Sequence, residues 1–142
     1  MLLADIAEKT YPNGLKVIAL KKTGTPVVSV QVWYKTGSSF EEQGARGISH
    51  FLEHMMFRGS RLVPPEEHAR RINDVGGHSN AFTAEDVTAF TNSVPSDFLD
   101  MVLSMEADRM DGLTFDPALF ETVWLVEIIR CHPGGSIVHQ RM

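Results

Sequence analysis

The chain has 142 residues, of which 43% are hydrophobic, so it is long enough for one domain with a core and too short for two ordinary ones. Its net charge of −5 argues against nucleic acid or an anionic membrane surface as the main partner. No apolar run approaches the length of a transmembrane helix, the start of the chain lacks a secretory signal, and one cysteine cannot form an intrachain disulfide. From these features we expect a cytoplasmic protein.

Residues 7–35 predict β structure. Turn-forming residues at 11–14 and 23–26 bound a short apolar run at 15–20. After the second turn, residues 28–34 alternate between apolar and polar side chains, as in a strand with one face on a core.

Residues 47–59 predict an amphipathic helix. Its apolar residues recur at the spacing that forms one stripe along a helix, and they are Ile48, Phe51, Leu52, Met55 and Met56. Gly59 is expected to end the helix, because glycine readily adopts the left-handed conformation found just after helices.

His50, Glu53 and His54 lie on the other face of this helix. Histidines four residues apart stack one turn above the other, close enough to share one cation. Two imidazoles suit zinc, which in catalytic sites usually takes a third protein ligand and leaves a position for water. The Glu53 carboxylate is then placed to act as a general base on that water. The alternative is an ordinary pair of histidines beside a solvated glutamate, but this ordered string arises by chance in only about one or two such chains in a hundred.

The remaining elements follow in chain order. We expect a helix that begins at Pro64–Pro65 and ends at 76–77, followed by strands at 79–83 and 87–94. Ser96 is the expected N-cap of a further helix, in which Leu99, Val102 and Leu103 face the core. A last helix begins at Asp116–Pro117. This order predicts an α+β fold in which helices cover a mainly antiparallel sheet.

Several motifs together resemble the inverzincin zinc peptidases of the pitrilysin, insulinase and mitochondrial processing peptidase type. They are Asn13–Val17, Gly37–Ser38 with Glu41, the string from Gly47 to Gly59, Asn80–Thr83 and Glu106–Met110. The resemblance extends from about Thr10 to Thr122, and residues 123–142 depart from the family pattern.

The resemblance implies a zinc-dependent endopeptidase with one Zn²⁺ ion, in which His50 and His54 bind the metal and Glu53 activates the attacking water. It also implies a two-layer α/β sandwich. Substrates of the family are often peptides or unfolded protein segments held in extended form against a sheet edge. The expected substrate-binding residues are Asn80, Ala81 and Phe82, on a strand that fits this edge.

The sequence offers two candidates for the third zinc ligand. In the family it is a glutamate on a downstream helix, and an ungapped count places it at Arg130, which cannot bind zinc. Glu127 is the nearest carboxylate, displaced on a helix by about 60° in azimuth and about 4.5 Å along the axis. Cys131 is the alternative, because a thiolate also binds zinc. With the His-x-x-Glu-His string, it would resemble S-ribosylhomocysteine lyase, an unrelated enzyme class.

We expect residues 1–142 to form a single, truncated N-terminal peptidase domain with an incomplete fold. A homologous domain or subunit would complete the chamber around the substrate. Three functions remain open: a zinc endopeptidase, a non-catalytic member of the same family that binds peptides or a partner subunit, and the lyase-like zinc enzyme.

Overall fold

The computed structural model describes residues 5–130, and for Asp5 and residues 124–130 it describes the backbone alone. The elements follow the predicted order of three strands, two helices, two strands and two helices. They are β1 (Asp5–Thr10), β2 (Lys16–Lys21), β3 (Val27–Tyr34), α1 (Ile48–Met55), α2 (Glu67–Asp74), β4 (His78–Thr83), β5 (Thr88–Pro95), α3 (Leu99–Gly112) and α4 (Pro117–Arg130). Two short 3-10 helices, η1 (Ser38–Phe40) and η2 (Ser96–Phe98), precede α1 and α3.

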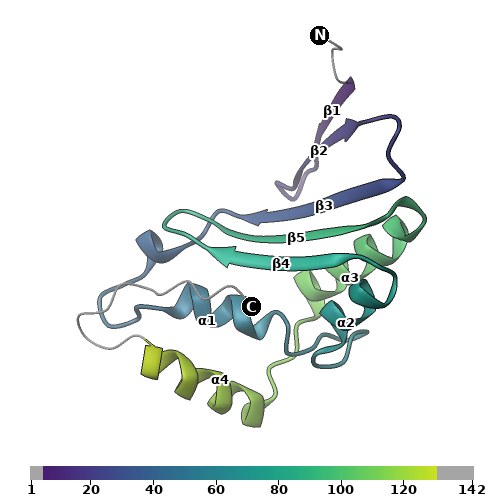
Figure 1. Ribbon diagram of the computed structural model, residues 1–142. Helices are drawn as coiled ribbons and strands as arrows, with labels where there is room; N and C mark the ends of the chain where they lie inside the picture. The colour runs from purple at the N-terminus through teal and green to yellow at the C-terminus, as the bar shows by residue number, and fades with distance from the viewer. Residues whose placement is uncertain (1–4, 131–142) are drawn as a thin grey trace.

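The described strands form two antiparallel sheets. One has the order β3-β5-β4, and the other is the β1–β2 hairpin. All four helices lie on one face of the three-stranded sheet, whereas the hairpin lies on the opposite side (Figure 1). The predicted α+β class, with helices covering an antiparallel sheet, is therefore confirmed. The sheet does not close.

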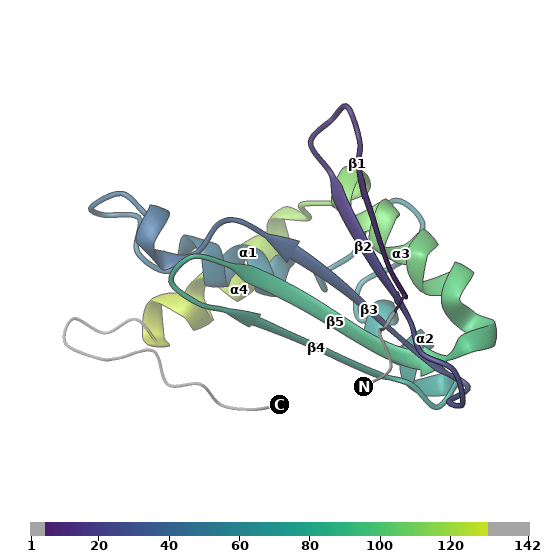
Figure 2. The same ribbon diagram turned by 90° about the horizontal axis from the view of Figure 1, so that it is seen from above.

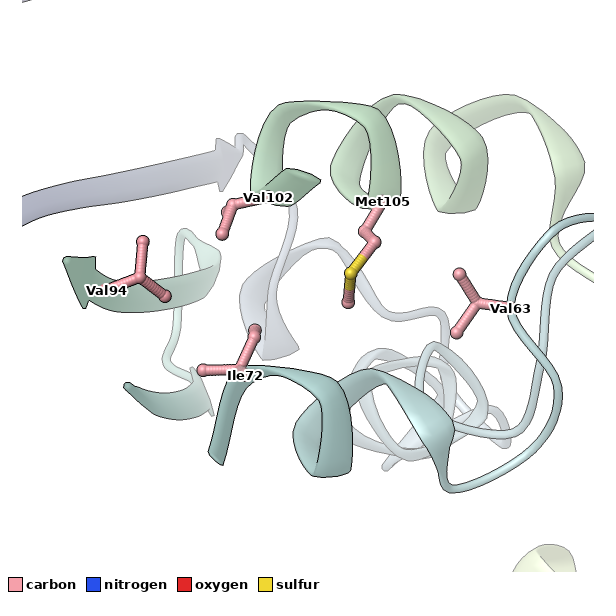
Figure 3. Close-up of a cluster of buried hydrophobic side chains, with 5 residues drawn as sticks. All are labelled: Val63, Ile72, Val94, Val102 and Met105. Carbon is pink, nitrogen blue, oxygen red and sulfur yellow. The ribbon is translucent and has the colours of Figure 1, made fainter. Parts of the chain in front are cut away.

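The larger core cluster forms where α2 and α3 pack against the sheet. Its buried side chains come from β5, both helices and the loop before α2, and they are Val63, Ile72, Val94, Val102 and Met105 (Figure 3). Val28 and Val30 of β3 pack against this cluster, as the alternation of β3 predicts. A buried patch of this kind fixes the register of the sheet, because a slip by one residue would turn these valines to solvent.

Helix α1 is shorter than the sequence predicts. It ends at Met55, and Phe57 N–H and Arg58 N–H then bond to carbonyls three residues back, which tightens the turn. Gly59, with φ of 114°, lies in the loop beyond, so the expectation that it ends the helix is wrong.

The predicted apolar stripe of α1 is buried only in part. Phe51, Met55 and Met56 are buried, whereas Ile48 and Leu52 are 50% and 41% exposed. The buried side of the helix thus faces α4 and the sheet, and the other apolar side chains remain on the surface.

The two last helices begin differently. Asp116 caps α4 as predicted, since its Oδ1 accepts hydrogen bonds from the backbone N–H of Ala118 and Leu119 at 2.8 and 3.3 Å. Ser96 does not cap α3; it opens η2, which runs directly into the helix. Leu103, expected to face in, is 48% exposed.

Among residues 5–130, no helix has the length and hydropathy of a membrane span.

Candidate metal centre

A carboxylate in the loop before α1 forms hydrogen bonds with the first backbone N–H groups of the helix. Both oxygens of Glu41 accept hydrogen bonds from backbone N–H groups, at 2.8 Å from Gly47 and 2.9 Å from Ser49. The first N–H groups of a helix have no partner inside it, and a carboxylate there also matches the helix dipole. Glu41 therefore caps the helix that carries the three residues of the proposed site.

The two histidines of α1 converge as their spacing predicts. Nε2 of His50 and Nε2 of His54 lie 3.2 Å apart, with the ring centroids at 4.6 Å. Two imidazole nitrogens that bind one tetrahedral zinc ion at about 2.05 Å lie about 3.4 Å from each other. The separation in the structure therefore fits a shared zinc ion.

Glu53 lies between these histidines and the sheet. It is 9% exposed, and its Oε2 accepts a hydrogen bond from the hydroxyl of Thr83, the last residue of β4. Thr83 is itself 6% exposed. The carboxylate is thus held in place and largely shielded from bulk water. No local pattern in the sequence predicts this contact, because the two residues belong to separate elements.

Helix α4, which carries the candidate ligand Glu127, packs against α1. The phenyl rings of Phe51 and Phe120 pack edge to face at 4.9 Å, and Val123 joins Phe51 and Met55 in a buried cluster. Figures 1 and 2 show α4 running alongside α1 in the opposite direction. Glu127 is placed in α4 one turn after Val123.

The described side chains hold no complete ligand set. Among them, no group of three or more histidine, cysteine, aspartate or glutamate side chains could hold a metal ion. The Glu127 side chain is not among those described, and Cys131 lies outside the described residues. The choice between these two as third ligand therefore stays a prediction.

The expected substrate-binding residues lie on an edge strand. Asn80, Ala81 and Phe82 belong to β4, which pairs with β5 along one side and with no other described strand. The Phe82 ring packs edge to face on Trp33 at 5.7 Å, on the sheet face away from the helices. Among residues 5–130, β4 thus offers one free row of backbone groups.

A buried ionic cluster joins α2, α3 and β5, and no local pattern in the sequence predicts it. The Glu106 carboxylate accepts hydrogen bonds from Asn92 at 2.5 Å and from Arg109 at 2.7 and 2.9 Å. The Arg109 guanidinium lies 4.1 Å from the centroid of the Phe90 ring, and His68 Nε2 lies 3.6 Å from Glu106 Oε1. The four polar residues are nearly inaccessible. The resemblance includes Glu106–Met110, but it does not identify these partners.

Burial decides the charges in this cluster. Burial lowers the pKa of His68, and the nearby Glu106 carboxylate offsets only part of this effect. Burial by itself would raise the pKa of Glu106, but the adjacent His68 and Arg109 lower it below its ordinary value. At neutral pH the cluster therefore contains a neutral imidazole beside a compensated carboxylate–guanidinium pair.

Comparisons with known proteins agree with the resemblance. The family model described as Insulinase (Peptidase family M16) matches residues 16–131. The probable mitochondrial-processing peptidase subunit beta of Arabidopsis thaliana is 34% identical over 107 residues, which are 75% of this chain and 20% of that protein. An uncharacterized zinc protease of Bacillus subtilis is 34% identical over 111 residues, 78% of this chain and 27% of that protein.

The fold is also similar to that of a solved structure. A protease from Helicobacter pylori matches 87% of this chain and 30% of its own, with a TM-score of 0.82 and 32% sequence identity. The chain thus spans only 20% and 27% of the length of the two curated relatives named above.

Proposed function

The chain belongs to the insulinase family, peptidase family M16, and we propose that it acts as a zinc-dependent endopeptidase on peptides or unfolded protein segments. The observation that carries this proposal is the convergence of His50 Nε2 and His54 Nε2 to 3.2 Å beside the buried Glu53 carboxylate. Relatives named as zinc proteases support the choice of metal.

Each side chain of α1 has a role in this proposal. His50 and His54 bind one Zn²⁺ ion, which supplies a Lewis acid that polarises the peptide carbonyl and makes water more acidic. Glu53 takes the proton of the attacking water and can later deliver it to the leaving amine. Because Glu53 is adjacent to His54 in sequence, one helical turn presents the metal ligands and the base together.

Glu127 is our proposal for the third zinc ligand. It is supported by the packing of α4 along α1 and by the place of residue 127 one turn after Val123, which contacts α1. A carboxylate beside two imidazoles is a common donor set for catalytic zinc. Cys131 remains the alternative third ligand, and with Cys131 as ligand the chain would be the lyase-like zinc enzyme.

The substrate is proposed to bind as an added strand along β4. The free edge of β4 would supply backbone hydrogen bonds, and side chains such as Phe82 would line neighbouring pockets. A homologous domain or subunit would supply the opposite wall of the site. Support for this partner comes from the relative named as a processing peptidase subunit.

A non-catalytic member of the family that binds peptides or a partner subunit is the second proposal. It is favoured by the free edge of β4 and by the relative named as a processing peptidase subunit, because binding a peptide or a partner subunit needs no complete set of zinc ligands. Such a module would still bind an extended peptide along β4, but it would not cleave it.

The test combines metal analysis with a peptidase assay. Zinc is measured by mass spectrometry on the purified chain, and cleavage is followed on a quenched fluorescent peptide. We expect one bound zinc and cleavage, both lost in Glu127→Gln, whereas Cys131→Ser changes neither. Glu53→Gln should keep the zinc and lose the cleavage. Zinc without cleavage in the unchanged chain, together with peptide binding that survives Glu53→Gln, would support the non-catalytic module instead.

A further inference from the structure

The contact between Thr83 and Glu53 joins the sheet to the helix of the proposed site. Thr83 Oγ1 donates its hydrogen bond to Glu53 Oε2, and the two residues are 30 positions apart in the sequence. Among the side chains that the structure describes, Thr83 is the one that forms a hydrogen bond with the Glu53 carboxylate. Both side chains are buried, at 6% and 9% exposure, so water does not readily replace this bond.

A second threonine lies beside the Thr83 hydroxyl. Thr88 pairs with Thr83 across β4 and β5, and its hydroxyl lies 3.5 Å from that of Thr83. Thr88 donates to the carbonyl of Thr36 at 3.1 Å. A hydroxyl has one proton to donate. In the contact with Glu53 the Thr83 hydroxyl is the donor, because an ionised carboxylate carries no proton and can only accept.

One segment fixes both ends of this contact. Ser39 donates to the carbonyl of Glu85, in the turn after Thr83, through its N–H at 2.8 Å and its hydroxyl at 2.7 Å. A Cβ on Gly37 would lie 2.2 Å from the carbonyl oxygen of Ala84, so the segment and the turn are in direct backbone contact. Two residues after Ser39, Glu41 caps α1. The end of β4 and the start of α1 are thus held by the same stretch of chain.

We propose that Thr83 is a positioning residue for Glu53 in the proposed peptidase reaction. Its hydroxyl holds one carboxylate oxygen, which restricts rotation of the side chain and leaves the other oxygen to take the proton of the attacking water. A base fixed in advance loses less freedom at the transition state than a mobile one. The proposal rests on the proposed function, so its test needs a reading that does not depend on cleavage.

The first measurement is a double-mutant cycle on the stability of the metal-free chain. Urea unfolding is measured for the unchanged chain, Thr83→Val, Glu53→Ala and the double variant. Valine keeps the shape of threonine and removes only the hydroxyl. We expect the effects of the two single changes on the unfolding equilibrium constant to be non-additive by about tenfold. Thr88→Val, which removes a buried hydroxyl that does not bond to Glu53, is the matched control and should show no such coupling.

The second measurement is the kinetics of peptide cleavage by the zinc-loaded chain. Thr83→Val should lower kcat by about tenfold or more with KM and zinc content unchanged, because only the orientation of the base is lost. Thr83→Ser keeps the hydroxyl and should restore most of kcat. If Thr83→Val only destabilised the fold, the folded fraction of the protein would decrease, and kcat per folded molecule would stay the same.

The outcomes separate the inference from the function on which it rests. Absence of coupling in the unfolding cycle overturns the inference, whatever the chain cleaves. Coupling with an unchanged kcat in Thr83→Val also overturns it, because the bond would then serve folding only. If the unchanged chain holds zinc and cleaves nothing, the proposed function fails, while tenfold coupling would still support Thr83 as the residue that orients Glu53.

Discussion

At the residue scale, the metal prediction depends on His50 and His54, whose Nε2 atoms face each other at 3.2 Å. We expect His54→Ala to weaken zinc binding by at least about 100-fold, because even residues that only support a ligand contribute about 10- to 100-fold. Competition with a fluorescent zinc chelator measures the affinity. His78→Ala removes an exposed histidine of β4 and serves as the control. Equal weakening in both variants would contradict the assignment of the site to α1.

The buried His68 predicts a dependence of stability on pH. The unfolded chain protonates this imidazole near its ordinary pKa of 6.5, whereas burial lowers the pKa in the folded chain. Below pH 6.5 the unfolded state therefore binds the proton first, and stability falls as the pH decreases. Glu106, Arg109 and Arg71 face His68, and the lowered pKa of Glu106 adds a further loss near and below its ordinary value of 4.5.

Substitution of His68 isolates its share of this effect. Between pH 7.5 and about 5.5, we expect the free energy of unfolding to fall less in His68→Gln than in the unchanged chain. The comparison uses the slope of stability with pH, measured by urea unfolding, so a lower overall stability of the variant does not affect it. Parallel slopes would show that the His68 imidazole does not titrate differently on folding.

At the element scale, the cap of α1 by Glu41 predicts a measurable cost of its removal. Glu41→Ala leaves two backbone N–H groups of α1 without their carboxylate partner, and we expect a loss of about 1–2 kcal/mol of stability. Zinc binding should weaken as well, because the first turn of α1 carries His50. Glu42→Ala, at the exposed neighbouring position, is the control in the same urea experiment. A cap that contributes nothing would give the two variants equal stability.

At the scale of the whole molecule, the β1–β2 hairpin leaves apolar surface uncovered. Ile6, Ile18 and Leu20 lie on one face of it and are 60–66% exposed. A two-stranded sheet without a core is stable only when another surface packs on it. Exposed apolar faces and free strand edges favour association. We therefore expect the chain to self-associate at micromolar concentration.

Paired substitutions on the hairpin test this expectation. Leu20→Lys places a charge on the apolar face and should shift the chain toward monomer in sedimentation velocity. Ala19→Lys places the same charge on the opposite face of β2 and should have little effect. If the unchanged chain sediments as a monomer and melts in one cooperative transition, the exposed face does not drive association.

Patterns along the chain were enough to predict the order of the elements, the fold class and the helix that carries His50, Glu53 and His54. These features depend on local periodicity and on residues that follow one another closely, and such patterns are visible along the chain. Convergence of the two histidines needed only the geometry of one helical turn. The resemblance of the motifs then led to the family, and the match over residues 16–131 confirms it.

The contacts between separate elements could not be predicted in this way, because they depend on the packing of the folded chain. Thr83 of β4 meets Glu53 of α1 across 30 positions, and Asn92 of β5 meets Glu106 of α3, so both contacts depend on how the helices pack on the sheet. Nothing in the local pattern distinguishes these polar residues from solvated ones, because a hydrogen bond between separate elements leaves no periodic signature. Exposure of Leu52 and Leu103 has the same origin, since the neighbouring elements, and not periodicity, decide which part of an apolar face is covered.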